Sequence, residues 1–242
     1  MGPGLALYSA ASVDAFAYYP GFKSADLLLA SLSVVFPLTV LAHPVTQPSP
    51  SDLNQQEKSD LRRRLISARQ SIPAQVWRQK SDRICEHLLN WSYFRQCRVI
   101  LAYTSFRQEP DLSPLSQHHR HWGLPRCGDK KQLHWHYWSA ESKWPLRKGA
   151  YGIIEPHPRS PQIDLSLVDL MLVPAVACDV RGYRLGYGGG YYDRLLSKAP
   201  WNAIPTVGIV FEYARLPNLP KDVWDRPLAG VCSESGLFLG EK

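Results

Sequence analysis

Residues 167–211 decide the fold; they read LVDLMLVPAVACDVRGYRLGYGGGYYDRLLSKAPWNAIPTVGIVF. Leu167–Val173 and Thr206–Phe211 are apolar runs of strand length. The glycine-rich segment Gly186–Gly190 lies between them and leads into the helical pattern of Tyr191–Lys198. A strand, a crossover helix and a second strand are typical of a parallel βαβ unit, so this stretch predicts a parallel sheet.

The chain before this stretch continues the alternation of helices and strands. Ser51 or Asp52 can cap a helix that ends at Ile72-Pro73, and a second helix is predicted after Pro73. Arg98–Tyr103 is apolar enough for a buried strand, and Leu133–Trp138 alternates with strand periodicity. Two further segments are predicted as a turn that opens a helix (Gln108–Asp111) and a polar surface loop (His118 to Lys131). The pattern predicts an α/β fold: a single domain with a largely parallel central sheet flanked by helices, in a Rossmann-like three-layer architecture.

Residues 1–50 differ from the remainder and are predicted to be an apolar and proline-rich extension to a catalytic domain at residues 51–242. The apolar stretch Leu27–Ala42 is short for a membrane span and contains Pro37. It has the length of a signal-peptide core, but its basic flank is a single lysine, Lys23. A disordered extension or an upstream start codon is therefore favoured over an export signal, followed by a linker at Pro44, Pro48 and Pro50.

Charge and cysteine content narrow the classes of protein. The formal charge of +7 suits an anionic ligand, which could be a nucleotide, a polyglutamated cofactor or a nucleic acid. The five cysteines are odd in number and scattered, without a C-x-x-C pair. This argues against a disulfide framework or a zinc site and favours a reducing compartment.

The glycine-rich segment is the first candidate site. Glycines let backbone N–H groups approach a phosphate closely, and the loop is predicted at the carboxyl end of a buried strand, where α/β sheets bind ligands. No Gly-Lys-Ser/Thr follows, which excludes a P-loop, and the spacing is not that of the dinucleotide fingerprint. Without its flanks the segment could be only a tight turn. Arg184 and Asp193 add a phosphate partner and a hard-cation ligand.

Two other groups of residues are weaker candidates. Lys58 and Arg62 share a helix face and could bind phosphate, whereas the run Arg62-Arg63-Arg64 by itself is typical of a solvated basic surface. Five histidines at 118, 119, 121, 134 and 136 invite a metal interpretation, but they lack the paired spacing of structural zinc sites.

Taken together, these segments resemble the 5-formyltetrahydrofolate cyclo-ligase (5,10-methenyltetrahydrofolate synthetase) family from about Lys58 to Phe238. Arg184 to Asp193 matches the family's R-L-G-x-G-x-G-Y-Y-D block. The supporting blocks are Lys58-x-x-Leu61-Arg62, Glu109, Tyr151-Gly152-Ile153-x-Glu155-Pro156, Val173-Pro174-Ala175-x-Ala177-x-Asp179 and Asp225-x-Pro227-Leu228. Where some relatives carry basic residues between the loop glycines, this chain has Tyr187 and Gly189.

The resemblance implies a ligase that cyclises 5-formyltetrahydrofolate to 5,10-methenyltetrahydrofolate with ATP as co-substrate. It implies catalytic roles for Arg184 and Glu109, and Mg²⁺ at Asp193 with Asp225. Folate would contact Thr104, Glu109 and Tyr151, although Tyr151 could equally be a core aromatic. The implied ATP contacts are Lys58, Arg62, Arg184, Leu185, Gly186, Tyr187, Gly188, Gly189, Gly190, Tyr191 and Tyr192.

The expectation that follows is a cytoplasmic monomer acting on small molecules, without nucleic-acid or membrane partners. Two alternatives from other classes stay open. One is a basic nucleic-acid-binding module that uses the Arg62–Arg64 helix, and its affinity would depend steeply on salt. The other is a sugar-phosphate isomerase or a CoA-transferase-like enzyme of related fold, which would need no ATP.

Overall fold

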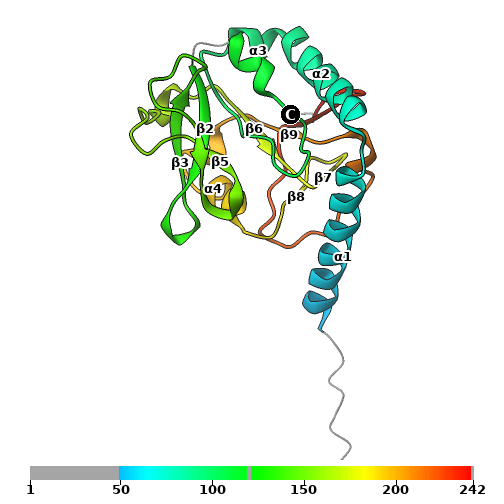
Figure 1. Ribbon diagram of the computed structural model, residues 1–242. Helices are drawn as coiled ribbons and strands as arrows, with labels where there is room; N and C mark the ends of the chain where they lie inside the picture. Colours follow the sequence, from blue (N-terminus) through cyan, green and yellow to red (C-terminus); the bar gives the residue numbers. More distant parts are fainter. Residues whose placement is uncertain (1–48, 119–120, 241–242) are drawn as a thin grey trace, which may run out of the picture. The chain divides into compact units, whose positions relative to one another are not determined.

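A mostly parallel sheet forms the centre of the computed structural model, which describes residues 49–118 and 121–240 (Figure 1). Within these residues, seven strands form the sheet in the order β12 (Gly236–Leu239), β11 (Gly230–Ser233), β9 (Thr206–Ile209), β6 (Leu170–Pro174), β1 (Val99–Leu101), β2 (His121–Cys127) and β3 (Leu133–Trp138). Neighbours from β11 to β2 are parallel, and the edge pairs β11–β12 and β2–β3 are antiparallel. The predicted α/β class with a largely parallel sheet is confirmed.

The central strands are apolar on both faces because both faces are covered. Ile100 faces one core cluster together with Ile84 and Leu88, whereas its neighbour Leu101 faces the opposite cluster. The register sets Ile100 opposite Leu170 and Met171 opposite Thr206. The carboxyl ends of β1, β6 and β9 therefore meet at one edge of the sheet.

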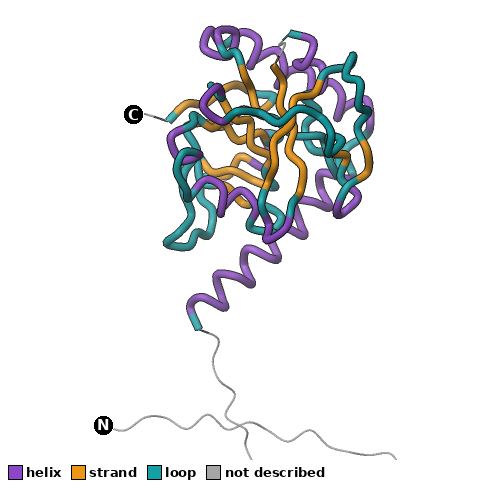
Figure 2. Tube along the Cα trace, turned by 90° about the vertical axis from the view of Figure 1, so that its left-hand side faces the viewer, coloured by secondary structure: helices purple, strands orange, loops and turns teal. Residues whose placement is uncertain are grey.

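The helices divide between these two faces. They are α1 (Pro50–Gln70), α2 (Ala74–Asn90), α3 (Ser92–Gln96) and α4 (Tyr191–Leu196). Helices α2 and α3 pack on the first cluster, whereas side chains of α1 and α4 pack on the second (Figures 1 and 2). Helix, sheet and helix make the predicted three-layer architecture.

Helix α1 begins earlier than the sequence predicts. Ser49 is the N-cap: its Oγ accepts a hydrogen bond from the Asp52 N–H at 3.2 Å, and the Asp52 carboxylate accepts one from the Ser49 N–H at 3.1 Å. Asp52 is therefore the partner in a capping box rather than the cap. Pro50 is the first helical residue, where its missing N–H costs nothing, so it belongs to the helix and not to a linker.

Two smaller sheets lie beside the central one. The first has the order β10 (Arg215–Leu216), β7 (Ala177–Asp179), β8 (Arg184–Leu185), and the second pairs β4 (Arg147–Lys148) with β5 (Ile154–Glu155). The glycine-rich loop therefore follows a short strand of a side sheet and not β6 directly. The antiparallel pair of β7 and β8 is missing from the sequence prediction, because a two-residue strand such as β8 carries no periodicity.

The structure corrects two other predictions. The segment predicted as a surface loop up to Lys131 contains strand β2, in which Trp122 and Leu124 are buried. Gly123 and Pro125 hide this strand in the sequence because both residues are unusual inside sheets. The segment after Asp111 forms the short 3₁₀ helix η1 (Ser113–Gln117) in place of the predicted α-helix. The other described 3₁₀ helices are η2 (Asp129–Lys131), η3 (Ala150–Gly152), η4 (Leu165–Leu167), η5 (Trp201–Ala203) and η6 (Glu212–Ala214).

The predicted extension, apart from Ser49 and Pro50, lies outside the described residues, as does His119. Across residues 49–118 and 121–240, the helices are too short or too polar to cross a bilayer.

Candidate active site

The glycine-rich loop connects β8 to α4 and has two left-handed residues. Gly188 has φ 92° and Gly190, the N-cap of α4, has φ 71°. Residues with a side chain rarely adopt these angles, so both positions require glycine. Leu185 is buried at the start of the loop, and Arg184 lies 5.5 Å from the ring centre of Tyr192 at its end. Packed side chains therefore hold both ends of the loop.

Helix α1 lies against this loop through Arg62. The Arg62 Nε donates to the Gly186 carbonyl at 2.7 Å. A side chain added at Gly188 would lie 3.7 Å from the Arg62 guanidinium carbon. Burial lowers the pKa of Arg62, but arginine stays charged throughout the physiological range. The predicted phosphate partner from α1 is therefore next to the predicted phosphate loop.

The two other predicted cations are paired with the predicted metal ligands. Arg184 forms an ion pair with Asp193, the third residue of α4. Lys58 is only 6% exposed, and its Nζ lies 2.8 Å from both Asp222 and Asp225. Burial lowers the pKa of Lys58, but the two carboxylates outweigh it and the net shift is upward.

Asp193 and Asp225 therefore belong to two separate ion pairs. In the part of the chain that the structure describes, no group of three or more acidic, histidine or cysteine residues could hold a metal ion by itself. Mg²⁺ usually takes one or two protein carboxylates and completes its shell with water and substrate phosphates. The donor set fits Mg²⁺ brought in with ATP and does not fit a metal cage made of protein alone. The absence of such a group also gives no support to the histidine metal hypothesis for the members that the structure describes, which are His118, His121, His134 and His136.

Glu109 is a buried carboxyl in the segment whose Phe106 contacts Tyr187 of the loop. It is 3% exposed, and the Phe106 N–H donates to its Oε2 at 3.1 Å. Within residues 49–118 and 121–240, Oε1 has no hydrogen-bond partner. Burial raises the pKa of Glu109 to about 7, although Arg69 opposes the shift. A buried acceptor with a spare oxygen is suited to a ligand N–H.

Thr104 contacts the chain segment that carries Tyr151. The Thr104 hydroxyl donates to the Ile154 carbonyl at 2.5 Å, three residues beyond Tyr151. The Tyr151 side chain is 70% exposed and packs edge-on against Tyr191, with the ring centres 6.4 Å apart. Its exposure excludes the alternative of a core aromatic and leaves a ring face open for stacking.

Sequence reasoning missed Arg69 and Asp222. Arg69 is eleven residues after Lys58 and seven after Arg62, so all three side chains share one face of α1. This spacing is visible in the sequence and could have revealed Arg69. Asp222 carries no comparable signal, because only the fold brings it to Lys58.

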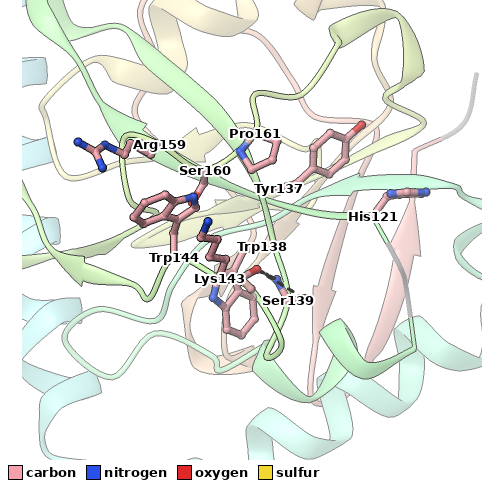
Figure 3. Close-up of a pocket in the computed structure, with 10 residues that line it drawn as sticks. His121, Tyr137, Trp138, Ser139, Lys143, Trp144, Arg159, Ser160 and Pro161 are labelled. Atoms are coloured by element: carbon pink, nitrogen blue, oxygen red, sulfur yellow. Dashed lines mark hydrogen bonds between the residues drawn. The ribbon is translucent and has the colours of Figure 1, made fainter.

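A separate cavity of about 380 Å³ lies away from the loop, at the edge strands (Figure 3). Its lining includes Tyr137 and Trp138 of β3 and the cations Lys143 and Arg159. Trp144 is already stacked on His157 at 4.8 Å. The cavity contains none of the residues predicted to bind ATP, folate or Mg²⁺, although His121 of the histidine group lines it.

Comparisons with known proteins agree with this geometry. A model of the 5-formyltetrahydrofolate cyclo-ligase family matches residues 54–234. Proteins named 5-formyltetrahydrofolate cyclo-ligase are 28% identical in Haemophilus influenzae (74% of this chain, 98% of that protein) and 25% identical in Escherichia coli (70% and 96%). The solved structure of Aquifex aeolicus 5,10-methenyltetrahydrofolate synthetase has a TM-score of 0.65 at 28% identity, covering 76% of this chain and 95% of that one.

Proposed function

This chain belongs to the 5-formyltetrahydrofolate cyclo-ligase family, and on that premise we propose that it converts 5-formyltetrahydrofolate to 5,10-methenyltetrahydrofolate with ATP, releasing ADP and phosphate. The observation that carries the proposal is the contact between Arg62 and Gly186, because it brings the cationic face of α1 onto the glycine-rich loop. Both elements lie inside the region that matches the family.

The ATP phosphates are proposed to bind between α1 and the loop. Lys58, Arg62 and Arg184 supply positive charge there, and the backbone of Gly186–Tyr192, preceded by Leu185, supplies N–H donors. Left-handed glycines at 188 and 190 support this role because they turn backbone N–H groups toward one side. Arg184 is already held by Asp193 and by the Tyr192 ring, so it is oriented before substrate binds.

Mg²⁺ is proposed to be held by Asp193 with help from Asp225, in company with the ATP phosphates. When bound, it neutralises charge on the phosphoryl group that is transferred. In the structure the same two carboxylates neutralise Arg184 and Lys58. Each ion pair therefore combines a proposed phosphate ligand with a proposed metal ligand.

Folate is proposed to bind with its formyl-bearing end at Glu109 and Thr104. The free Oε1 of Glu109 can accept a hydrogen bond from a substrate N–H, and the exposed ring of Tyr151 can stack on an aromatic part of the folate. The Tyr187 ring of the glycine-rich loop packs against Phe106, whose N–H donates to Glu109, which supports adjacent folate and ATP sites.

The proposed reaction has two chemical steps. The formyl oxygen attacks the γ-phosphorus of ATP, and ADP leaves. N10 of the folate then attacks the activated formyl carbon, the C–O bond breaks with the oxygen departing on phosphate, and the N10 proton is lost. Phosphoryl transfer of this kind depends mainly on positioning and on charge neutralisation, which Arg62, Arg184 and Lys58 provide.

The structure offers less support for a nucleic-acid-binding module. Arg62 is engaged by the glycine-rich loop, and exposed Arg63 pairs with Asp60, so the run Arg62–Arg64 is not one continuous basic surface. Family membership also disfavours the isomerase and transferase alternatives. We further propose a cytoplasmic monomer, for which the five free cysteines support a reducing compartment.

The direct test is the absorbance of methenyltetrahydrofolate after mixing the protein with 5-formyltetrahydrofolate, ATP and Mg²⁺. We expect product only when all three are present. Salt-sensitive binding of nucleic acid without methenyl formation would favour the alternative module.

A further inference from the structure

Arg69 is a buried arginine that connects three separate segments. It is 3% exposed, and its Nε donates to the Arg107 carbonyl at 2.9 Å. Its Nη1 donates to the Ala175 carbonyl at 3.4 Å, just after β6, and its Nη2 donates to the Tyr187 hydroxyl in the glycine-rich loop. The guanidinium also lies 5.5 Å from the centre of the Tyr187 ring. One side chain therefore ties the loop to the segment after β1.

The segment after β1 needs such a support. Arg107 and Gln108 both adopt left-handed conformations, with φ of 48° and 56°. Two consecutive side-chain-bearing residues in this region are strained and persist only when their surroundings hold them. The Arg69 contact with the Arg107 carbonyl holds the first of them, and Glu109 follows directly.

Tyr187 closes the connection between Arg69 and Glu109. Its hydroxyl accepts a hydrogen bond from Arg69, and the neighbouring Phe106 N–H donates to the Glu109 carboxylate at 3.1 Å. Its ring also packs against Phe106, with ring centres 6.2 Å apart. Tyr187 lies between Gly186 and Gly188, so the connection passes directly into the glycine-rich loop.

We propose that Arg69 is a positioning residue that, through Tyr187, fixes the glycine-rich loop and the Glu109 carboxyl relative to each other. The proposal rests on the proposed function. It assigns one side chain to both ends of the site: the loop that binds ATP and the carboxyl that meets the folate. Loss of Arg69 or of the Tyr187 hydroxyl then impairs use of both substrates, although neither change removes a proposed ligand of the folate.

The charge of Arg69 also acts on the Glu109 carboxyl. The titratable groups that face Glu109 are Arg69 on α1, Tyr187 in the loop, Tyr103 after β1 and Tyr192 on α4. Burial raises the pKa of all three tyrosines, so they stay neutral at physiological pH. Arg69 is therefore the fixed positive charge that opposes protonation of Glu109.

The test measures kcat/KM for 5-formyltetrahydrofolate against pH at saturating ATP, and KM for ATP at one pH. Wild type is expected to lose activity on the acid side near the pKa of Glu109, about 7. Arg69→Met is expected to move this acid limb upward by about one pH unit, since an adjacent arginine typically lowers a carboxyl pKa by one to three units. Arg69→Lys keeps the charge and should leave the limb in place while raising KM for ATP.

Tyr187→Phe keeps the ring and removes only the hydroxyl, which lowers the risk of misfolding. It is expected to raise KM for ATP about fivefold, the effect of one ordinary hydrogen bond, and to move the acid limb upward. Tyr93→Phe is the matched control, because it deletes a hydroxyl on α3 that donates to the Asp169 carbonyl at 2.9 Å. It should change neither quantity.

Should Arg69→Met fail to fold, Arg69→Lys and Tyr187→Phe decide the question. The proposal is overturned if both variants keep the wild-type KM for ATP and Tyr187→Phe keeps the wild-type acid limb. If wild type forms methenyltetrahydrofolate and the variants show these unchanged values, only this inference is rejected. Absence of methenyl formation by wild type rejects the proposed function and the inference with it.

Discussion

At the scale of single residues, Glu109 shows how burial changes a carboxyl group. Its pKa is raised from the ordinary value of 4.5 to about 7. Between these two pH values the folded protein keeps the carboxyl protonated, whereas the unfolded chain has released the proton. The stability that this group contributes is full below pH 4.5 and is lost as pH rises through about 7. A residue with this cost is typical of a functional site.

We therefore predict a pH-dependent difference between wild type and Glu109→Gln. As pH rises from 4.5 to about 8, the free energy of unfolding of wild type should fall relative to the variant by up to about 3 kcal/mol, since each pKa unit corresponds to about 1.4 kcal/mol. Urea unfolding of both proteins across this range measures it. A difference independent of pH would show that Glu109 titrates normally.

Asp193 is a residue for which stability and catalysis should separate. Its carboxylate is half-exposed in the ion pair with Arg184, and such pairs contribute little to stability. Asp193→Asn loses the charge that a hard cation prefers. Turnover should fall by orders of magnitude, with the melting temperature nearly unchanged and partial recovery at high Mg²⁺. Asp60→Asn is the control, because the Asp60 carboxylate is similarly exposed and also forms an ion pair, with Arg63 on α1.

Rate measurements over a Mg²⁺ titration decide between a metal ligand and a helix-terminal carboxylate. Near-normal turnover of Asp193→Asn with unaltered Mg²⁺ dependence would reject the metal role.

At the scale of elements, helix α1 presents a functional face and a solvent face. Arg62 contacts the loop, whereas Arg64 is exposed two residues away. We predict that Arg62→Met raises KM for ATP by roughly 10- to 100-fold, because a hydrogen bond from a charged group contributes about 1.5–3 kcal/mol. Arg64→Met removes the same charge from the solvent face and should have little effect. Equal effects of the two changes would mean that net charge, not position, attracts ATP.

Local sequence patterns identified some elements and missed others. Helices α1 and α2 are found from the helical spacing of their apolar residues, strands β1, β6 and β9 from apolar runs, and β3 from its alternation. Strand β2 is hidden by Gly123 and Pro125, and β8 is too short to show a period. Pairing with distant neighbours stabilises these strands, and a local pattern does not contain that information.

At the scale of the whole molecule, the site could be predicted where the family blocks cover it. The loop, Arg62, Arg184 and Glu109 are candidates from the sequence, and the structure brings α1, the loop and the Glu109 segment together. The Lys58 pair with Asp222 and the Arg69 bond to Tyr187 were not predictable, because each joins residues more than 100 positions apart.

The boundary of the catalytic domain gives a prediction at the same scale. We expect a chain of residues 47–242, which keeps the Ser49 cap, to retain full turnover, because the capping box and every proposed site residue lie within it. Ser49→Ala in that chain should cost about 1 kcal/mol of stability, measured by urea unfolding. Loss of turnover or insolubility on removal of residues 1–46 would show that the apolar segment packs on the domain.

The central claim is that ATP activates the formyl oxygen, and the fate of that oxygen tests it most directly. The substrate would be 5-formyltetrahydrofolate labelled with oxygen-18 in the formyl group, and the released phosphate would be analysed by phosphorus NMR. The account predicts that the label appears in phosphate, with one labelled phosphate for each methenyltetrahydrofolate formed. Unlabelled phosphate, with the label released to water, would contradict it.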